Sequence, residues 1–265
     1  MIGAATVAPV IVTKGRFVVG TIHQLKVTLR DAHPLVWRRI HVPSTANLLD
    51  LHNVIQFAMG WDNEHLHMFA KEWMEYGDNA SSEYDVTLAA LLPTIGGRLA
   101  YRYDFGDCWD HDIEVEKIHQ GAPKTTYPRC TAGGRACPPE DTGGPDGFVE
   151  HLRALRHRKG WKYQQARHLF GSGTWDGAAW DKDEVNDHLA ELAKHWAKRD
   201  ANRARELAAE QEAATSAKTS PAPSSPANDR PENGGFRDGE ATKIVEGHRP
   251  GATVPKLIPQ HARRK

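Results

Sequence analysis

The hydrophobic and polar positions in the first quarter of the chain predict two strands followed by a helix. Residues 22–30 and 35–42 alternate apolar and polar side chains with a period of two, which is typical of half-buried strands. The turn-forming residues Asp31–Pro34 separate them and predict a β-hairpin. Apolar residues then recur at helical spacing from Leu48 to Met59, which predicts a helix that ends at Gly60.

The pattern continues with mixed elements up to about residue 120. The predicted elements are a strand at 65–75, a short helix at 85–92, and two strands at about 98–105 and 110–119. The last two strands alternate clearly and are joined by a tight turn containing Gly106 and Asp107. This second hairpin carries an unusual density of acidic, thiol and imidazole side chains, so it is the first place to look for a site.

The rest of the chain is predicted to be a long loop followed by helices. Residues 121–147 are rich in Gly and Pro and are interpreted as loop, and such a long loop in a compact domain is usually either functional or disordered. Helices are predicted at 148–158, at 161–170 and from Asp183, where one apolar face is evident. The predicted fold class is α+β, with helices packed against a mainly antiparallel sheet in a single domain.

Composition divides the chain into four predicted parts. These are a flexible N-terminal leader at 1–20, a folded domain at 21–200, a solvated helix extension at 201–214, and a disordered basic tail at 215–265. The tail is rich in Pro, Ser and Gly and holds 7 of the 16 prolines, and such composition cannot bury enough apolar surface to fold. No internal repeat is visible.

Charge is balanced overall but unevenly distributed. The chain has 34 basic and 34 acidic residues; residues 215–265 hold 9 and 5 of them, which leaves 25 and 29 for residues 1–214. The body therefore has a formal charge of about −4, which argues against a DNA-binding core, and the tail about +4. With three Cys, no signal-peptide pattern and no long apolar stretch, the expectation is a cytoplasmic protein that does not enter a membrane.

Five ordered motifs in the sequence together point to a family. They are Trp37-Arg-Arg-Ile with Val42-Pro, Leu51-His-x-x-Ile-Gln-x-Ala-Met-Gly-Trp61, His65-Leu-His-x-Phe69, Tyr103-Asp-Phe-Gly-Asp-x-Trp-x-His111 and Cys137-Pro-Pro-Glu-Asp-x-Gly-Gly144. The string resembles the plasmid pRiA4b ORF-3-like domain family, whose members are also described as insertion-element passenger or TnpR-like proteins. The resemblance covers about residues 20–200. It implies a fold and an association with plasmids or transposons, but no activity.

The sharpest chemical hypothesis is a zinc site formed by Cys108, His111, Cys130 and Cys137. Thiolate and imidazole suit tetrahedral Zn²⁺, and the spacing of Cys108 and His111 allows one turn to present both. The other two cysteines flank a Gly-rich loop that is able to fold back. The competing interpretation is that the three thiols are small buried side chains without a metal, which is the more common situation.

A second hypothesis involves His65 and His67, which would share one face of a strand. If that face meets Asp104 or Asp107, a site with two histidines and one carboxylate results. The competing interpretation is a network of ion pairs on a polar face of the sheet.

The third cluster of candidate residues is Glu140 and Asp141. Pro138 and Pro139 stiffen the chain before them, and the glycine pair Gly143-Gly144 permits a sharp turn after them. This arrangement would aim the two acids at a site as base or ligand, whereas the competing interpretation is ordinary loop or helix capping.

Three functions remain open on this basis. The first is a non-enzymatic accessory or interaction module with a protein partner, which would bind through the 121–147 loop and the Asp104–His111 turn. The second is a metal-dependent, hydrolytic enzyme. The third is a nucleic-acid-binding accessory acting through the basic tail. The sequence contains no nucleophile, phosphate-loop or dinucleotide motif and no evident separate helix-turn-helix with a basic recognition helix.

Overall fold

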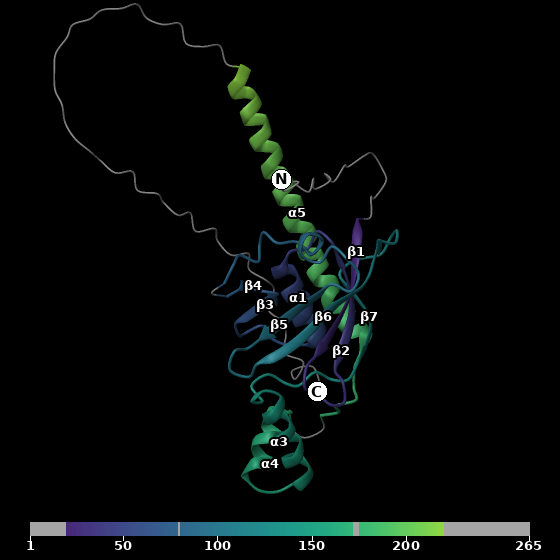
Figure 1. Ribbon diagram of the computed structural model, residues 1–265, viewed down its shortest axis with the longest axis vertical. Helices are drawn as coiled ribbons and strands as arrows, with labels where there is room; N and C mark the ends of the chain where they lie inside the picture. The colour runs from purple at the N-terminus through teal and green to yellow at the C-terminus, as the bar shows by residue number, and fades with distance from the viewer. Residues whose placement is uncertain (1–19, 79, 172–174, 220–265) are drawn as a thin grey trace, which may run out of the picture. The chain divides into compact units, whose positions relative to one another are not determined.

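The protein forms one seven-stranded antiparallel sheet with helices packed against it (Figure 1). The computed structural model describes residues 20–78, 80–171 and 175–219. The strands are β1 Thr21–Leu29, β2 Trp37–Pro43, β3 His67–Lys71, β4 Met74–Gly77, β5 Arg98–Tyr103, β6 Trp109–Gln120 and β7 Arg129–Gly134, in the sheet order β4-β3-β5-β6-β1-β2-β7. The helices are α1 Leu48–Met59, α2 Leu88–Leu91, α3 Gly144–His157, α4 Trp161–Leu169 and α5 Lys182–Thr219. The α+β class predicted from the sequence is confirmed.

The two predicted hairpins are present with the expected alternation of buried and exposed side chains. In β1, Leu25, Val27 and Leu29 are buried while the residues between them are partly exposed. The long strand β6 pairs with β5 on one side and with β1 on the other, so both hairpins join through it. This arrangement places the turn between β5 and β6 at one end of the middle of the sheet.

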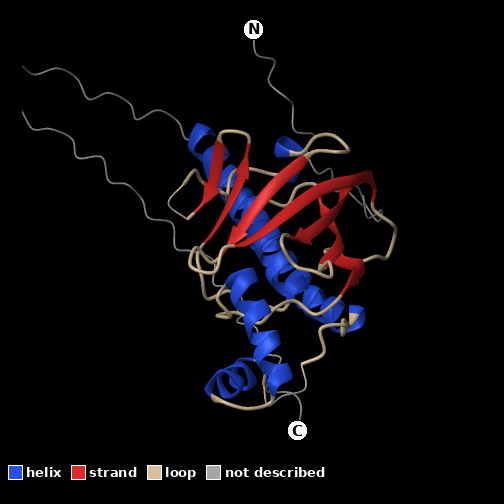
Figure 2. Cartoon of the chain, turned by 60° about the horizontal axis from the view of Figure 1, so that its bottom comes forward, coloured by secondary structure: helices blue, strands red, loops and turns tan. Residues whose placement is uncertain are grey.

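Helix α1 packs on the apolar face of the sheet, as Figure 2 shows, and nearly all its residues are buried. Its N-terminus is capped by Asn47, whose side chain accepts a hydrogen bond from the main-chain N–H of Asp50 at 2.8 Å. Its C-terminus is closed by Gly60 in the left-handed conformation, φ 84°. The ring of Phe57 on α1 is in edge-to-face contact with the ring of His188 on α5. This contact links α1 to the first turns of α5.

The opposite face of the sheet is covered by paired charges. Four arginine–carboxylate pairs lie on it: Arg30–Asp112, Arg39–Glu116, Arg98–Glu114 and Arg102–Asp110. Three of these pairs join neighbouring strands or their ends, and Arg39–Glu116 reaches across β1 from β2 to β6, so these charges are held as cross-strand pairs.

The single strand predicted at 65–75 is wrong. The segment is a hairpin of β3 and β4, because Glu72 adopts a left-handed conformation with φ 55° and reverses the chain. Trp73 lies at the tip of this hairpin with 97% of its surface exposed. His65 precedes β3 and is therefore not in a strand with His67.

The interpretation of 121–147 as loop is wrong for its central part. Residues Arg129–Gly134 form the edge strand β7, paired antiparallel with β2. The Gly-rich sequence has little intrinsic preference for a strand, so the pairing with β2 decides its conformation. The helices predicted at 148–158 and 161–170 are present as α3 and α4.

Helix α5 extends further than the apolar pattern alone indicates, to Thr219. Val185, Leu189, Leu192 and Trp196 form its buried face. The described residues 197–219 belong to a second compact unit, in which every described side chain from 200 to 215 is exposed. The predicted leader, apart from Gly20, and the predicted tail beyond Thr219 lie outside the described residues. Within the described part of the chain, no helix combines the length and apolarity needed to cross a membrane.

Candidate metal centre

Three of the predicted binding residues come together in space: His65, Asp104 and Asp141, called here the His65 cluster. One ligand atom from each lies within 4.8 Å of the others. The imidazole Nδ1 of His65 lies 3.6 Å from Asp104 Oδ2, and its Nε2 lies 3.4 Å from Asp141 Oδ1. These two distances belong to different ring nitrogens of His65, and a cation binds only one of them. The 4.8 Å limit is wider than the roughly 3.4 Å between ligand atoms on a tetrahedral ion, so the three side chains would close around a bound cation.

The turn between β5 and β6 fixes the first carboxylate. Asp104 has φ 59°, a left-handed conformation that is uncommon for residues other than Gly, and its side chain is only 12% exposed. Its Oδ1 accepts hydrogen bonds from the main-chain N–H groups of Gly106 at 2.8 Å and Asp107 at 3.3 Å. These bonds occupy one carboxylate oxygen and leave Oδ2 directed at His65, as an outer shell does for a metal ligand.

The loop between β7 and α3 brings the second carboxylate to the same place. Asp141 also has positive φ, at 58°, and its side chain is 71% exposed. The loop is attached to the β5–β6 turn because Asp107 Oδ2 accepts a hydrogen bond from Gly143 N–H at 3.0 Å. Gly144 packs so closely that a Cβ on it would lie 2.2 Å from the carbonyl oxygen of Asp107. The glycine pair noted in the sequence is therefore needed for this close approach.

Glu140 anchors the same loop from its other side. Its carboxylate accepts a short hydrogen bond from the hydroxyl of Tyr103 and a second one, at 2.9 Å, from the main-chain N–H of Asp62. Burial raises the pKa of the Glu140 carboxyl, and these two hydrogen bonds oppose that rise. The Tyr103 hydroxyl also accepts from the N–H groups of Glu64 and His65, at 3.0 and 3.3 Å.

His67 takes part in a different, buried cluster. Its ring nitrogens face Glu83 Oε2 at 2.8 Å and Asp78 Oδ2 at 3.3 Å. The ring stacks on that of His52 with centroids 3.6 Å apart. Burial, and to a smaller degree the neighbouring His67, lowers the pKa of His52 well below its usual range. The two histidines of the motif therefore serve two separate clusters, and the hypothetical site with two histidines and one carboxylate is not formed.

The four residues of the zinc hypothesis are not brought together. Among the described residues, the only group of three or more potential ligands within 4.8 Å is the His65 cluster. Cys130 is buried on the edge strand β7, and its thiol is directed at the carbonyl of Ala132 at 3.4 Å. The Cys108 thiol lies in the β5–β6 turn, 3.4 Å from the carbonyl of Phe105. Burial raises the pKa of the Cys137 thiol to about 12, so this thiol is protonated in the metal-free protein.

His111 lies inside the core instead of facing the site. Its Nδ1 is 2.9 Å from the carbonyl of Trp109, and its ring makes an edge contact with Trp61. Its Nε2 is buried without a hydrogen-bond partner among the described residues. Burial lowers the pKa of His111 to about 4, so the imidazole is neutral at physiological pH.

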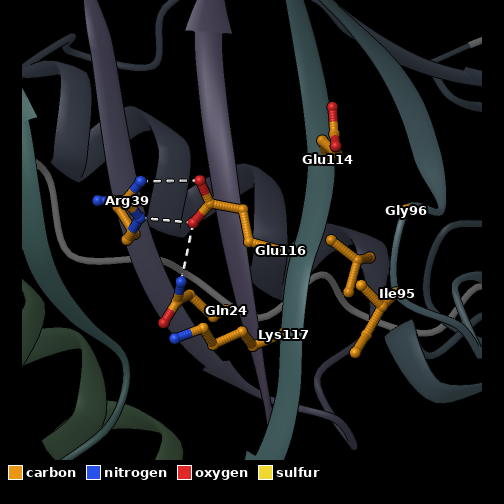
Figure 3. A pocket seen from close by; sticks show the side chains of 8 residues that line it. Gln24, Arg39, Ile95, Gly96, Glu114, Glu116 and Lys117 are labelled. Carbon is orange, nitrogen blue, oxygen red and sulfur yellow. Dashed lines mark hydrogen bonds and ion pairs between the residues drawn. The ribbon is translucent and has the colours of Figure 1, made fainter.

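A shallow open pocket lies on the polar face of the sheet (Figure 3), and none of the predicted site residues lines it. Two of its charged residues are paired with each other: Glu116 accepts hydrogen bonds from Arg39 at 2.5 and 2.8 Å, and also from Gln24 at 2.8 Å. The lining contains no imidazole. It therefore lacks the converging acids and imidazoles of a catalytic cleft.

Tyr103 is the residue of the site that the sequence did not identify. Its alternation with Tyr101 along β5 agrees with the buried ring but does not indicate the partners of the hydroxyl. The position of Tyr103, directly before Asp104, is the only signal in the sequence that places its hydroxyl near the turn.

Comparison with known proteins supports the resemblance given by the motifs. The sequence profile of the plasmid pRiA4b ORF-3-like proteins matches residues 21–187. The chain is 35% identical over 189 residues to the uncharacterized protein y4hQ of Sinorhizobium fredii, covering 68% of this chain and 97% of that protein. A crystal structure of the protein of unknown function MM3350 from Methanosarcina mazei Go1 is similar with a TM-score of 0.56 and 35% identity, covering 62% of this chain and 97% of that one.

Proposed function

Because the chain belongs to the plasmid pRiA4b ORF-3-like protein family, whose compared members are described as uncharacterised, we propose a function from the site itself. The protein is an accessory domain that binds one divalent cation through His65, Asp104 and Asp141. The observation that carries this proposal is the convergence of an imidazole and two carboxylates, from three separate segments, within 4.8 Å.

The cation would act as a clamp between two loops. Asp104 comes from the β5–β6 turn, and Asp141 comes from the loop before α3. A divalent ion bound between the two carboxylates would neutralise both and fix their distance. The exposed residues of the two loops, which include Phe105 at 42% exposure, then form an ordered surface for a protein partner.

The ligand types limit the metals that fit. Two carboxylates and one imidazole suit Zn²⁺ or Mn²⁺, whereas Cu⁺ prefers thiolate and thioether ligands, and Ca²⁺ requires more oxygen atoms. Left-handed φ angles at both Asp104 and Asp141 support a functional role, because backbone strain of this kind concentrates at functional sites.

The second candidate is a metal-dependent hydrolytic enzyme. It is favoured by the three-ligand set, since catalytic zinc sites keep an open position for water while structural sites are closed by a fourth ligand. The family name refers to a plasmid, which supports a plasmid gene context for either function.

The test is metal binding by the full chain. We expect isothermal titration with Zn²⁺ and with Mn²⁺ to show one site per chain, with affinity falling at least 10-fold in His65→Ala and Asp141→Asn. Asparagine tolerates positive φ, so Asp141→Asn removes the charge without adding backbone strain.

Two control variants distinguish binding at the His65 cluster from binding elsewhere. His33→Ala removes an exposed imidazole outside the cluster and should leave binding unchanged. Cys137→Ser should also leave it unchanged; loss of zinc in that variant would assign the metal to the thiols and refute the His65 cluster. Screening of the loaded protein against phosphate and carboxyl esters separates the accessory function from the enzymatic one.

A further inference from the structure

Helices α3 and α4 form a small helical hairpin with its own core. They are joined by a turn of three residues, 158–160, and are followed by Phe170 and Trp175. The rings of Phe148, Phe170 and Trp175 meet at centroid distances between 5.2 and 5.9 Å, and Ala166 of α4 is fully buried. The inner faces of the two helices are therefore used for packing, and the outer faces are left for solvent or a partner.

The hairpin is strongly basic although the body of the protein is acidic. Residues 144–171 hold six basic residues, Arg153, Arg156, Arg158, Lys159, Lys162 and Arg167, and only two acidic ones, Asp146 and Glu150. All six basic side chains are exposed. The contact between Lys162 and Glu150 is 3.9 Å long and exposed on both sides, so it neutralises little of this charge.

The outer face of α4 carries side chains suited to reading a nucleic acid. Four exposed residues stand at positions i, i+3, i+4 and i+7 of the helix, which lie on one face: Trp161, Gln164, Gln165 and His168. Trp161 is 70% exposed, at the first position of the helix. Glutamine side chains pair with adenine edges, and the first residues of a recognition helix are those that reach the bases.

The turn between α3 and α4 contains a cationic residue at a position where glycine would carry less backbone strain. Arg158 ends α3 in the left-handed conformation with φ 54°, a position that glycine usually occupies. The guanidinium of Arg158 adds positive charge to the turn, which is the part of the hairpin that would approach a phosphate backbone.

We propose that the α3–α4 hairpin is a docking surface for double-stranded DNA, with α4 in the major groove and the six cations on the phosphates. The proposal does not depend on the cation site. A short basic helix with glutamines on its outer face fits the wide major groove of B-form DNA, whereas the major groove of A-form RNA is too deep and narrow for it. A membrane surface is a poorer match, because Trp161 is the only large apolar side chain on that face of α4.

The test measures the affinity of the full chain for a fluorescein-labelled duplex of about 24 base pairs. Fluorescence anisotropy reports the binding at salt concentrations between about 50 and 200 mM. We expect a steep salt dependence. The triple variant Arg156→Ser, Arg158→Gly, Arg167→Ser should bind at least 10-fold more weakly at 50 mM salt, and its log–log slope should fall by about 0.9 for each phosphate that the hairpin no longer neutralises. The single variant Arg158→Gly should weaken binding while keeping the thermal midpoint, because glycine relieves the strain of the turn.

The matched control removes the same charge elsewhere. Arg98→Ser, Lys117→Ser, Lys124→Ser takes three exposed cations from the sheet and its loops. Retained binding in this control together with weaker binding in the hairpin variant supports the proposal. Equal weakening in both variants, no duplex binding at 50 mM salt, or tighter binding to an RNA duplex or to phosphatidylglycerol vesicles would overturn it.

Discussion

The side-chain amide of Asn186 on α5 forms hydrogen bonds with both main-chain groups of Cys130 on the edge strand β7. Its Oδ1 accepts from Cys130 N–H at 2.8 Å, and its Nδ2 donates to Cys130 C=O at 2.9 Å. Asn186 thus replaces the neighbouring strand that β7 lacks on its outer side. It blocks the edge from pairing with another chain and attaches α5 to the sheet.

We expect Asn186→Ala to lower the free energy of unfolding by about 2 kcal/mol, since two hydrogen bonds to a partly buried backbone are removed at about 1 kcal/mol each. Urea denaturation followed by circular dichroism measures this. Asp187→Ala is the matched control, because its side chain is exposed on the next position of the same helix. Equal decreases in the two variants would show that the bonds to Cys130 contribute nothing.

The same pair explains why β7 could not be predicted. Its sequence, RCTAGG, contains two glycines and lies between prolines, so local preference argues for a loop. The strand exists because β2 pairs with it on one side and Asn186 binds it on the other. Both partners are far away in sequence, and no local pattern reports them.

The strands with clear alternation were predictable because the side-chain period is a local property. For β1, β2, β5 and β6, burial of every second residue produces the pattern, and the predicted segments agree with the structure within a few residues. The prediction of one strand at 65–75 failed at Glu72. This residue adopts a left-handed conformation and reverses the chain, although no Gly or Pro at that position indicates a turn.

The site was predictable as a list of residues but not as a set of partners. The sequence proposed His65, Asp104 and Asp141 as candidates, but joined His65 to His67, which it does not contact at the site. Whether two loops meet depends on the packing of Gly144 against Asp107, two residues that are 37 positions apart in the sequence. The basic hairpin was missed because charge summed over residues 1–214 hides a local excess.

Tyr103 should matter for the candidate metal centre through its hydroxyl alone. Tyr103→Phe removes the donor to Glu140 and the acceptor for the N–H groups of Glu64 and His65. We expect unfolding to become easier by about 2 kcal/mol and cation affinity to fall about 10-fold, since the loop carrying Asp141 loses an anchor.

Thermal denaturation and metal titration of Tyr103→Phe measure the two effects. Tyr84→Phe is the control, because Tyr84 is 56% exposed and away from the cluster. A Tyr103→Phe variant with unchanged stability would mean that the hydroxyl network does not hold the loop.

Gly144 offers a test of the loop attachment. Gly144→Ala places a Cβ at φ 69° and 2.2 Å from the Asp107 carbonyl oxygen, so the loop must move away from the β5–β6 turn. Gly160→Ala has a similar φ of 83° with no atom within 4 Å of the new Cβ. The control therefore carries only the backbone strain of about 1–2 kcal/mol, and the variant carries the clash in addition.

We expect Gly144→Ala to lose more stability than Gly160→Ala and to weaken cation binding at least 10-fold, while Gly160→Ala keeps its affinity. The measurements are thermal denaturation and isothermal titration with Zn²⁺. Equal cation affinities in the two variants would mean that the position of Asp141 does not depend on the packing of Gly144 against Asp107.

His111 predicts how stability changes with pH. Burial lowers its pKa to about 4 in the folded protein, below the value of about 6.5 in an unfolded chain. Between these values the unfolded state binds more protons, so the contribution of His111 to stability is fully present above pH 6.5 and is lost as pH falls toward 4. At pH 5 the loss relative to pH 7 is about 2 kcal/mol.

The variant His111→Phe keeps an aromatic ring beside Trp61 but cannot take up a proton. Between pH 7 and pH 5, the unfolding free energy of this variant should fall by about 2 kcal/mol less than that of the unmodified protein. At pH 7 the variant will be less stable than the unmodified protein, because the hydrogen bond to the Trp109 carbonyl is removed. Urea titrations at both pH values measure the difference, and His33→Asn, an exposed histidine, should retain the full pH dependence. If His111→Phe lost as much stability on acidification as the unmodified protein, another buried imidazole would be responsible, and His52, whose pKa is also lowered by burial, would be the next variant to measure.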